Sequence, residues 1–270
     1  ALGGGHPDRK RLVAGATDLG VQYNHGRFVP QEVIYTCRLR ELRGIRFQND
    51  HLVIGATATW GAIEEAVRDR IPQYYEILTR FGSPQIRHLG TLAGNLANGS
   101  PIADSIPMHM VCGAIIEVAS VRGRREIPIE DFYLGYKKLA LEPDEVILSI
   151  RTPLPPADVH LRLQKVSKRR DMDISTVTAA FWIKEAHGEI AEARIALGGV
   201  GPTVVRVPGA EAWLNGKPLE ALIEAGRMAR QEVTPISDVR GSADYRWQLV
   251  ENLFAKTFFD LPASQVSSGT

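Results

Sequence analysis

The stretch G-T-L-A-G-N-L-A-N-G-S-P-I-A-D-S-I-P, at residues 90–107, determines how the rest of the sequence is interpreted. Its glycines leave the backbone free to adopt positive φ angles or to approach a ligand closely. Asn95, Asn98 and Ser100 add short side chains that donate and accept hydrogen bonds. Asp104 requires backbone N–H groups, a hydroxyl or water around it, because an unpaired buried carboxylate is costly. The alternative is a turn-rich loop that caps a helix, whereas the whole pattern favours a loop wrapped around a phosphate-bearing cofactor.

A second glycine-bearing turn lies at residues 11–20, which read R-L-V-A-G-A-T-D-L-G. A short strand at residues 12–14 runs into a turn that holds Gly15 and Gly20, and successive N–H groups in such a turn form a concave nest for a phosphate oxygen. The turn lacks the G-K-[ST] of a Walker loop, and the G-x-G-x-x-G spacing occurs nowhere in the chain. Nucleoside triphosphate hydrolysis and a Rossmann dinucleotide site are therefore unsupported. By itself the turn fits a hairpin as well as a phosphate loop.

The composition excludes several classes of protein. A net charge of +1 gives no support to a nucleic-acid partner, and no apolar run approaches the length of a membrane span. The 2 cysteines, Cys37 and Cys112, are far apart, which excludes a disulfide framework and any cysteine-ligated zinc or iron–sulfur site within this chain. His88 has no second ligand at metal-binding spacing, so we expect no metal site. Isolated cysteines suit a reducing cytoplasm, which is the expected location.

The order of predicted elements indicates an α+β protein of two domains. Strand patterns at 51–59, 114–121, 125–129 and 145–150 surround helix patterns at 62–70 and 74–80. The proline-rich segment P-L-P-P-A-D at 153–158 opposes both helix and central strand, and it marks the domain boundary. Strands at 161–166, 174–182 and 191–197, with a hairpin turn near His187, precede helices at 219–232 and 243–258. We therefore expect domains at 1–153 and 159–262 and a polar tail at 263–270.

Three segments of the sequence resemble the flavin-binding part of the molybdenum hydroxylases. They are L-V-A-G-A-T-D-L-G at 12–20, F-G-S-P-Q-I-R-H-L-G-T-L-A-G-N-L-A-N-G-S-P-I-A-D at 81–104 and K-V-S-K-R-R-D-M-D-I-S at 165–175. The resemblance extends from about residue 11 to residue 259, and within the family it is strongest to the xanthine dehydrogenases. It implies a FAD-binding domain of the vanillyl-alcohol-oxidase (PCMH) type, followed by a smaller α+β domain like the C-terminal domain of CO dehydrogenase flavoproteins. The family has a strand and a helix before the first glycine loop, and the glycine-rich start of this sequence suggests that they are missing.

The resemblance also implies which residues contact FAD. Phe81 would stack near the isoalloxazine, Asp104 would lie close to the ring system, and Lys165 would reach the flavin from the second domain; these three are the candidate catalytic residues. The loop at 168–173 would influence the reaction with NAD or oxygen. The residues implied to wrap the pyrophosphate are Leu12, Val13, Ala14, Gly15, Ala16, Thr17, Asp18 and Leu19. Those implied to line the rest of the FAD site are Phe81, Ile86, Gly90, Thr91, Gly94, Asn95, Ala97, Asp104, Ile147 and Lys165.

The chemistry implied is electron transfer rather than acid–base catalysis. Electrons would come from 2Fe–2S clusters and leave as a hydride to NAD, while a molybdenum cofactor on a partner would oxidise the substrate. Two such clusters need about eight cysteines, so they must lie on a partner domain or subunit. The alternatives are a molybdenum hydroxylase of carbon monoxide, aldehydes or aromatic compounds, and a nucleotide-binding module without redox function. A free-standing flavoenzyme like UDP-N-acetylenolpyruvoylglucosamine reductase is a third.

Overall fold

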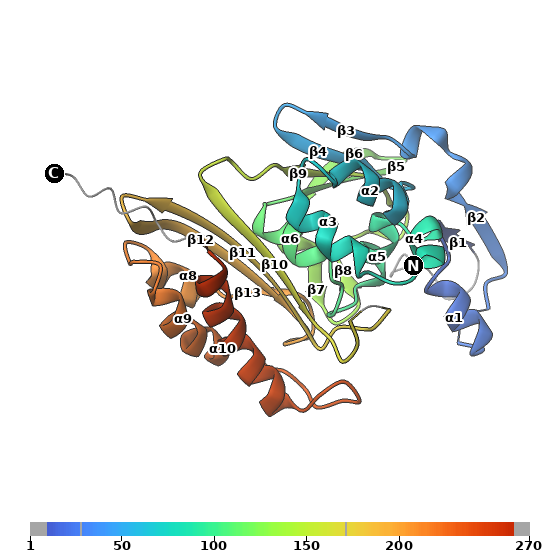
Figure 1. Cartoon of the computed structure of the whole chain (residues 1–270). Helices are drawn as coiled ribbons and strands as arrows, with labels where there is room; N and C mark the ends of the chain where they lie inside the picture. The colour runs from blue at the N-terminus through green and yellow to red at the C-terminus, as the bar shows by residue number, and fades with distance from the viewer. Residues whose placement is uncertain (1–9, 28, 171, 262–270) are drawn as a thin grey trace.

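The computed structural model describes residues 10–27, 29–170 and 172–261 (Figure 1). The glycine-rich start at 1–9, the tail at 263–270 and Asp171 of the loop at 168–173 therefore lie outside the described residues. At the N-terminal edge, β1 (Lys10–Val13) pairs in parallel with β2 (Glu32–Tyr35), and α1 (Leu19–Asn24) connects them. Two 3₁₀ turns, at Thr36–Arg38 and Arg40–Leu42, lead into the first large sheet.

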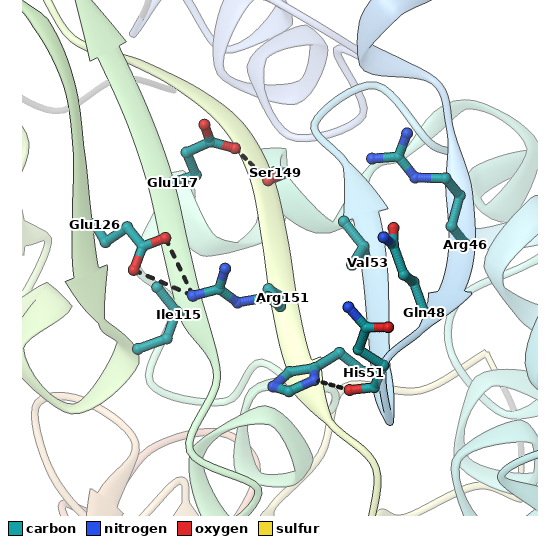
Figure 2. A pocket seen from close by; sticks show the side chains of 10 residues that line it. Arg46, Gln48, His51, Val53, Ile115, Glu117, Glu126, Ser149 and Arg151 are labelled. Atoms are coloured by element: carbon teal, nitrogen blue, oxygen red, sulfur yellow. Dashed lines mark hydrogen bonds and ion pairs between the residues drawn. The ribbon is translucent and has the colours of Figure 1, made fainter.

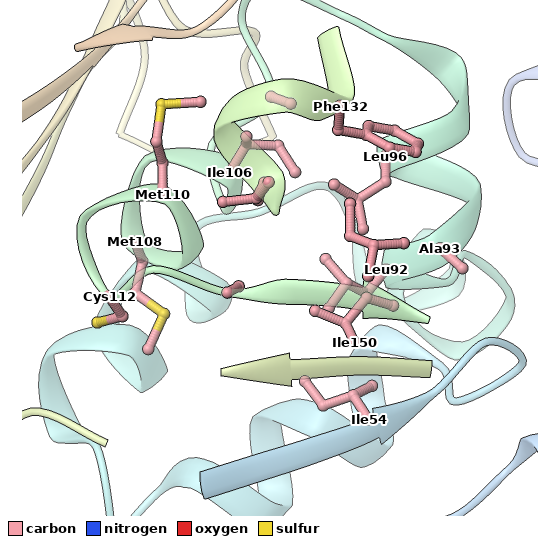
Figure 3. Close-up of a cluster of buried hydrophobic side chains, with 14 of the residues drawn as sticks. Ile54, Leu92, Ala93, Leu96, Ile106, Met108, Met110, Cys112, Phe132 and Ile150 are labelled. Atoms are coloured by element: carbon pink, nitrogen blue, oxygen red, sulfur yellow. The ribbon is translucent and has the colours of Figure 1, made fainter. Parts of the chain in front are cut away.

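The first large sheet has five antiparallel strands in the order β3-β4-β9-β5-β6. Its alternating side chains, such as Leu52 and Ile54, point into a core that α5 and α6 cover (Figure 3). The strands are β3 (Ile45–Gln48), β4 (His51–Gly55), β5 (Ile115–Ser120), β6 (Gly123–Pro128) and β9 (Val146–Pro153). The helices of this half are α2 (Trp60–Val67), α3 (Pro72–Thr79), α4 (Pro84–Leu89), α5 (Leu92–Asn98), α6 (Ile106–Val111) and α7 (Ile129–Phe132), and a small hairpin joins β7 (Tyr133–Gly135) to β8 (Lys138–Leu139).

The stretch at 90–107 is not a loop throughout, as its glycines suggested. It contains α5, which begins after Thr91, whose Oγ1 accepts a hydrogen bond of 3.0 Å from the N–H of Gly94. Leu92 and Leu96, four residues apart, form one fully buried helix face, and Gly99 ends the helix in the left-handed region at φ 61°. The prediction of a continuous loop was wrong because the apolar pair at helical spacing decides the local structure.

The second half is a sheet covered on both faces. The antiparallel strands β10 (Val159–Val166), β11 (Val177–Ala186), β12 (Glu189–Gly198) and β13 (Val205–Arg206) lie in that order. One face packs against α8 (Pro208–Leu214), α9 (Ala221–Gln231) and α10 (Ala243–Asp260), which lie together on the outside in Figure 1. The other face packs against α3 and α6 of the first half, so most of β11 is buried. The α+β class is confirmed.

Several predicted elements have different limits in the structure. The strand expected at 174–182 begins only at Val177 and continues to Ala186, where the expected hairpin turns at His187 and Gly188 with φ angles of 55° and 81°. The helix expected at 62–70 spans Trp60–Val67. The short elements β3, α4 and α8 had no sequence pattern strong enough to predict them.

Candidate functional site

The two glycine loops contact each other through their backbones. A Cβ placed on Gly15 would overlap the carbonyl group of Leu89 and would lie 2.8 Å from Cα of Gly90. A Cβ on Gly90 would in turn lie 3.0 Å from Cδ1 of Trp60 and 3.3 Å from Oγ1 of Thr17. Position 15 therefore requires glycine for steric reasons, and a Cβ on Gly90 would be tight against its neighbours. The turn at 14–19 therefore packs directly against the segment at 89–91. The sequence suggested only that the two segments were related.

A narrow cleft lies between these loops. It has a volume of about 100 Å³, and a smaller hollow of about 60 Å³ continues it beyond Ala14 and Gly94, which line both. Leu12, Ala97 and Ile147 line the smaller hollow. The residues that line the cleft itself are Ala14, Gly15, Ala16, Thr17, Asp18, Leu19, Trp60, Phe81, Ile86, Gly90, Thr91, Gly94, Asn95 and Asn98. Every residue implied to contact FAD is therefore brought to these two hollows except Val13, Asp104 and Lys165.

The floor of the cleft suits a pyrophosphate group. Within the described residues, the backbone N–H groups of Gly15, Ala16 and Thr17 donate to no other backbone group, and Ala16 has a left-handed φ of 57°. The N–H of Gly20 closes the turn by donating to the carbonyl of Ala16 at 2.7 Å. Successive N–H groups in such a turn make a concave site for an anion. The residues present therefore fit the phosphate-bearing part of FAD.

An aromatic pair forms one wall of the cleft. The ring centroids of Trp60 and Phe81 are 4.6 Å apart with an interplanar angle of 51°. The N–H of Trp60 donates to the carbonyl of Gly90 at 2.9 Å, which ties this wall to the second glycine loop. Trp60 was missed from the sequence, although an aromatic residue that follows a strand and opens a helix was a usable signal.

Asp104 and Lys165 are brought together, but neither lines the cleft. Nζ of Lys165 donates to Oδ2 of Asp104 at 2.6 Å and to the carbonyl groups of Arg80 and Asp173, each at 3.0 Å. The hydroxyl expected near Asp104 is that of Ser175, which donates to Oδ1 at 2.5 Å. The exposed fractions of the Lys165 and Asp104 side chains are 2% and 7%. Burial raises the pKa of Asp104 above its ordinary value, and the ammonium group of Lys165 opposes that rise.

A larger cavity of about 700 Å³ adjoins the cleft, and Asp18 and Asn98 line both spaces. It is formed by both halves of the chain. The first half contributes Tyr136 and Lys137, and the second half contributes Ile174, Arg240 and Arg246 among others. The Arg246 side chain is only 3% exposed, and its guanidinium donates to the carbonyl of Gly199 and to Asp238, each at 2.7 Å.

A separate hollow of about 490 Å³ lies on the face of the five-stranded sheet (Figure 2). Several of its polar groups bond to one another across the sheet. Nη2 of Arg151 donates to both carboxylate oxygens of Glu126 at 3.1 Å, and the hydroxyl of Ser149 donates to Glu117 at 2.9 Å. None of the residues implied by the sequence lies there, which indicates a solvated sheet face rather than the site.

Neither a cluster of metal-ligating side chains nor a membrane-spanning helix occurs in the described part of the chain. No group of three histidine, cysteine or carboxylate side chains in that part of the chain could hold a metal ion. Among the helices described, none combines the length and apolar character needed to span a bilayer.

Comparison with known proteins identifies the family. Residues 5–155 match the FAD binding domain in molybdopterin dehydrogenase, and residues 162–261 match the CO dehydrogenase flavoprotein C-terminal domain. The chain belongs to the molybdenum hydroxylase family. It is 33% identical over 263 residues to the xanthine dehydrogenase FAD-binding subunit of Escherichia coli O157:H7, covering 94% of this chain and 89% of that protein. It is 30% identical over 258 residues to the nicotinate dehydrogenase FAD-subunit of Eubacterium barkeri, covering 93% and 87%.

A solved relative has the same fold. The match to a carbon monoxide dehydrogenase from Hydrogenophaga pseudoflava has a TM-score of 0.86 and 31% sequence identity, and it covers 92% of this chain and 87% of that chain. The two-domain fold implied by the resemblance is therefore confirmed, and so is FAD as the cofactor of this molybdenum hydroxylase subunit. Its relatives include dehydrogenases named for xanthine, nicotinate and carbon monoxide. The family therefore identifies the chain as part of an oxidoreductase but does not identify the substrate.

Proposed function

We propose that this chain holds FAD between its two glycine loops and passes electrons to NAD as the flavin component of a xanthine dehydrogenase. The electrons would come from 2Fe–2S clusters of an iron–sulfur domain, and a molybdopterin-binding large subunit would carry the molybdenum cofactor. One observation carries the cofactor position in this proposal. The backbone of Gly15 contacts residues 89–90, and next to it the N–H groups of Ala16 and Thr17 donate to no other backbone group of the described residues. FAD, when bound, accepts electrons and gives up a hydride, and the protein orients it.

The residues of the cleft would bind and orient the cofactor. The N–H groups of Gly15, Ala16 and Thr17 would hold the pyrophosphate, and no arginine or lysine lines the cleft to do so instead. Phe81, supported by Trp60, would contact the isoalloxazine and keep water from it. These two aromatic rings make one wall of the cleft apolar, and the face of Phe81 suits contact with a ring system.

We propose that Asp104 and Lys165 act beside the flavin as a fixed, buried charge pair. Lys165 also holds the carbonyl groups of Arg80, next to Phe81, and of Asp173, in the loop at 168–173. Because three acceptors surround one ammonium group, the pair fixes the position of both loops. The positions of Arg80 and of the loop at 168–173 depend on this ion pair. This dependence supports the assignment of Asp104 and Lys165 to the flavin site.

The cavity of about 700 Å³ supports NAD as the electron acceptor. It adjoins the cleft at Asp18 and Asn98, so a ligand there would lie next to the bound flavin. Tyr136, which is 61% exposed, offers a ring for stacking, and Lys137 offers positive charge to a pyrophosphate. NAD is a dinucleotide, and its aromatic and anionic parts match this ring and this positive charge.

The visible absorption spectrum during anaerobic titration with NADH tests this proposal. Flavin bands that bleach with NADH would support both the cofactor position and the acceptor. Bands that persist would contradict NAD as the acceptor and favour oxygen or a quinone. A protein that contains no flavin and cannot be reconstituted with FAD would favour a nucleotide-binding module without redox function.

Nicotinate and carbon monoxide are the other candidate substrates. The identities to the xanthine and nicotinate relatives are 33% and 30%, which is too small a difference to separate them. Assaying the isolated complex with xanthine, nicotinate and carbon monoxide distinguishes the candidates. We also propose that 1–153 and 159–262 are two domains, because the second sheet forms a hydrophobic core of its own with α8, α9 and α10, although its other face packs against the core of the first domain.

A further inference from the structure

Arg87, on α4, makes a set of contacts that no function considered so far uses. Its Nε donates to Oε2 of Glu64 on α2 at 2.7 Å. Its Nη1 donates to three carbonyl groups, those of Thr79 at 3.5 Å, Phe81 at 3.3 Å and Gly82 at 3.0 Å. The side chains of Arg87 and Glu64 are 13% and 17% exposed, so the pair is largely removed from solvent.

The three carbonyl groups converge because the chain reverses direction here. α3 ends at Thr79. The backbone N–H groups of residues 80–81 cap the carbonyl groups of residues 77–78, and Arg87 reaches the carbonyl of Thr79. The chain then turns at Gly82, whose φ is 58°, and enters α4 two residues later. A cation at this point neutralises the negative end of α3 and joins it to the turn. A guanidinium can do both, because its donors lie in one rigid plane, whereas an ammonium group acts as a single point charge.

This turn carries two residues of the cleft. Phe81 packs against Trp60 in the aromatic wall, and Ile86 lines the cleft one residue before Arg87. Ile86 also packs under the turn, since a Cβ on Gly82 would lie 3.1 Å from its Cγ2. Arg87 itself does not line the cleft. It can therefore affect a bound ligand only through the position of these neighbours.

We propose that Arg87, paired with Glu64, is a positioning residue for the aromatic wall of the flavin cleft. By holding the carbonyl groups of residues 79–82, it fixes the ring of Phe81 and the side chain of Ile86 where the isoalloxazine is bound. The inference rests on the proposed position of FAD between the glycine loops. It adds a residue that touches neither cofactor nor substrate.

The test compares Arg87→Lys with a matched control in the intact complex isolated with this chain. Arg230→Lys is the control, because Arg230 joins α9 to α10 through a 2.7 Å ion pair with Glu251, and these two helices lie on the opposite side of the molecule from β1 and α4 (Figure 1). The readouts are the Kd for FAD, from flavin fluorescence, and the visible circular dichroism of the bound flavin. The latter reports how the protein surrounds the isoalloxazine, which a loss of stability alone would not change. We expect Arg87→Lys to raise the Kd about tenfold or more and to alter the dichroism, and Arg230→Lys to change neither.

Three outcomes would overturn the proposal. An Arg87→Lys variant with a Kd within about twofold of the wild type and unchanged dichroism removes the role of Arg87. If that variant does not fold, Glu64→Gln decides, because it weakens the same clamp; unchanged FAD binding there also overturns the proposal. If Gly15→Ala leaves FAD binding intact, the cleft itself is misplaced, and the proposed cofactor position fails together with this inference. Loss of FAD in Gly15→Ala with normal binding in Arg87→Lys leaves the proposed function standing and rejects only the inference.

Discussion

Replacing Gly15 with alanine tests the contact between the glycine loops. The new Cβ would overlap the carbonyl group of Leu89, and since real Cβ atoms keep about 3.0 Å from such atoms, the two loops must separate by about 1 Å. Both sides of the contact are backbone, so no side chain can rotate to relieve it. Overpacking of this kind costs about 1–3 kcal/mol in the free energy of unfolding. A displacement of about 1 Å in a binding site can cost about 100-fold in function, so we expect the Kd for FAD to rise by that order.

The assay is FAD content after gel filtration, followed by fluorescence titration of the apoprotein with FAD. Gly20→Ala is the matched control, because Gly20 lies in the same segment and a Cβ there meets no atom within 4 Å. Since Gly20 lies within α1, its replacement should leave FAD binding unchanged and stabilise the protein by about 0.5–1 kcal/mol. A Gly15→Ala protein that retains full FAD and the wild-type melting temperature would refute the close contact on which the site is built.

Four further predictions concern the buried ion pair, His109 and the large cavity. Lys165→Met leaves the Asp104 carboxylate buried without its cation, so the free energy of unfolding in urea should fall by about 3–5 kcal/mol. Adding Asp104→Asn to that variant should restore part of the loss. A Lys165→Met variant with an unchanged free energy of unfolding contradicts the pairing. Asp104→Ala should slow the reduction of NAD in rapid kinetics more than it weakens FAD binding, and unchanged hydride transfer would remove its role at the flavin. Burial lowers the pKa of His109 to about 3, below its value of about 6.5 in the unfolded chain. The free energy of unfolding should therefore be highest above about pH 6.5 and should fall by up to about 1.4 kcal/mol per pH unit as the pH drops toward 3. Urea titrations at several pH values should show that this free energy depends less on pH in His109→Gln. Tyr136→Ala should raise the KM for NAD without changing the FAD content, and an unchanged KM argues against the large cavity as the acceptor site.

The sequence was most informative where structure depends on local turn chemistry. The turn after residue 14 was predicted because glycine and small polar residues follow a short apolar strand, and the structure places a left-handed residue, Ala16, at its centre. The hairpin at His187 and Gly188 was predicted for the same reason, since both residues adopt positive φ there. In each case the residues that define the turn are adjacent in the chain.

The features that could not be predicted depend on residues far apart in the chain. β9 lies at the centre of its sheet, between β4 and β5, and no property of residues 146–153 specifies those two neighbours. The ion pair between Asp104 and Lys165 joins positions 61 residues apart, and no local pattern in the sequence connects them. Long-range pairings of this kind are determined by how whole elements pack, which local patterns do not report.

The packing of the second sheet places a residue of the second domain next to the aromatic wall of the cleft. Because α3 and α6 cover one face of β10, β11 and β12, the second domain shares the core of the first. This packing brings Lys165, on β10, within 2.6 Å of Asp104 and within 3.0 Å of the carbonyl of Arg80, next to the aromatic wall of the cleft. The same contact forms the large cavity, whose lining comes from both domains. A substitution that loosens the contact between α6 and β12 should therefore alter the acceptor site before it disturbs the glycine loops, which belong wholly to the first domain.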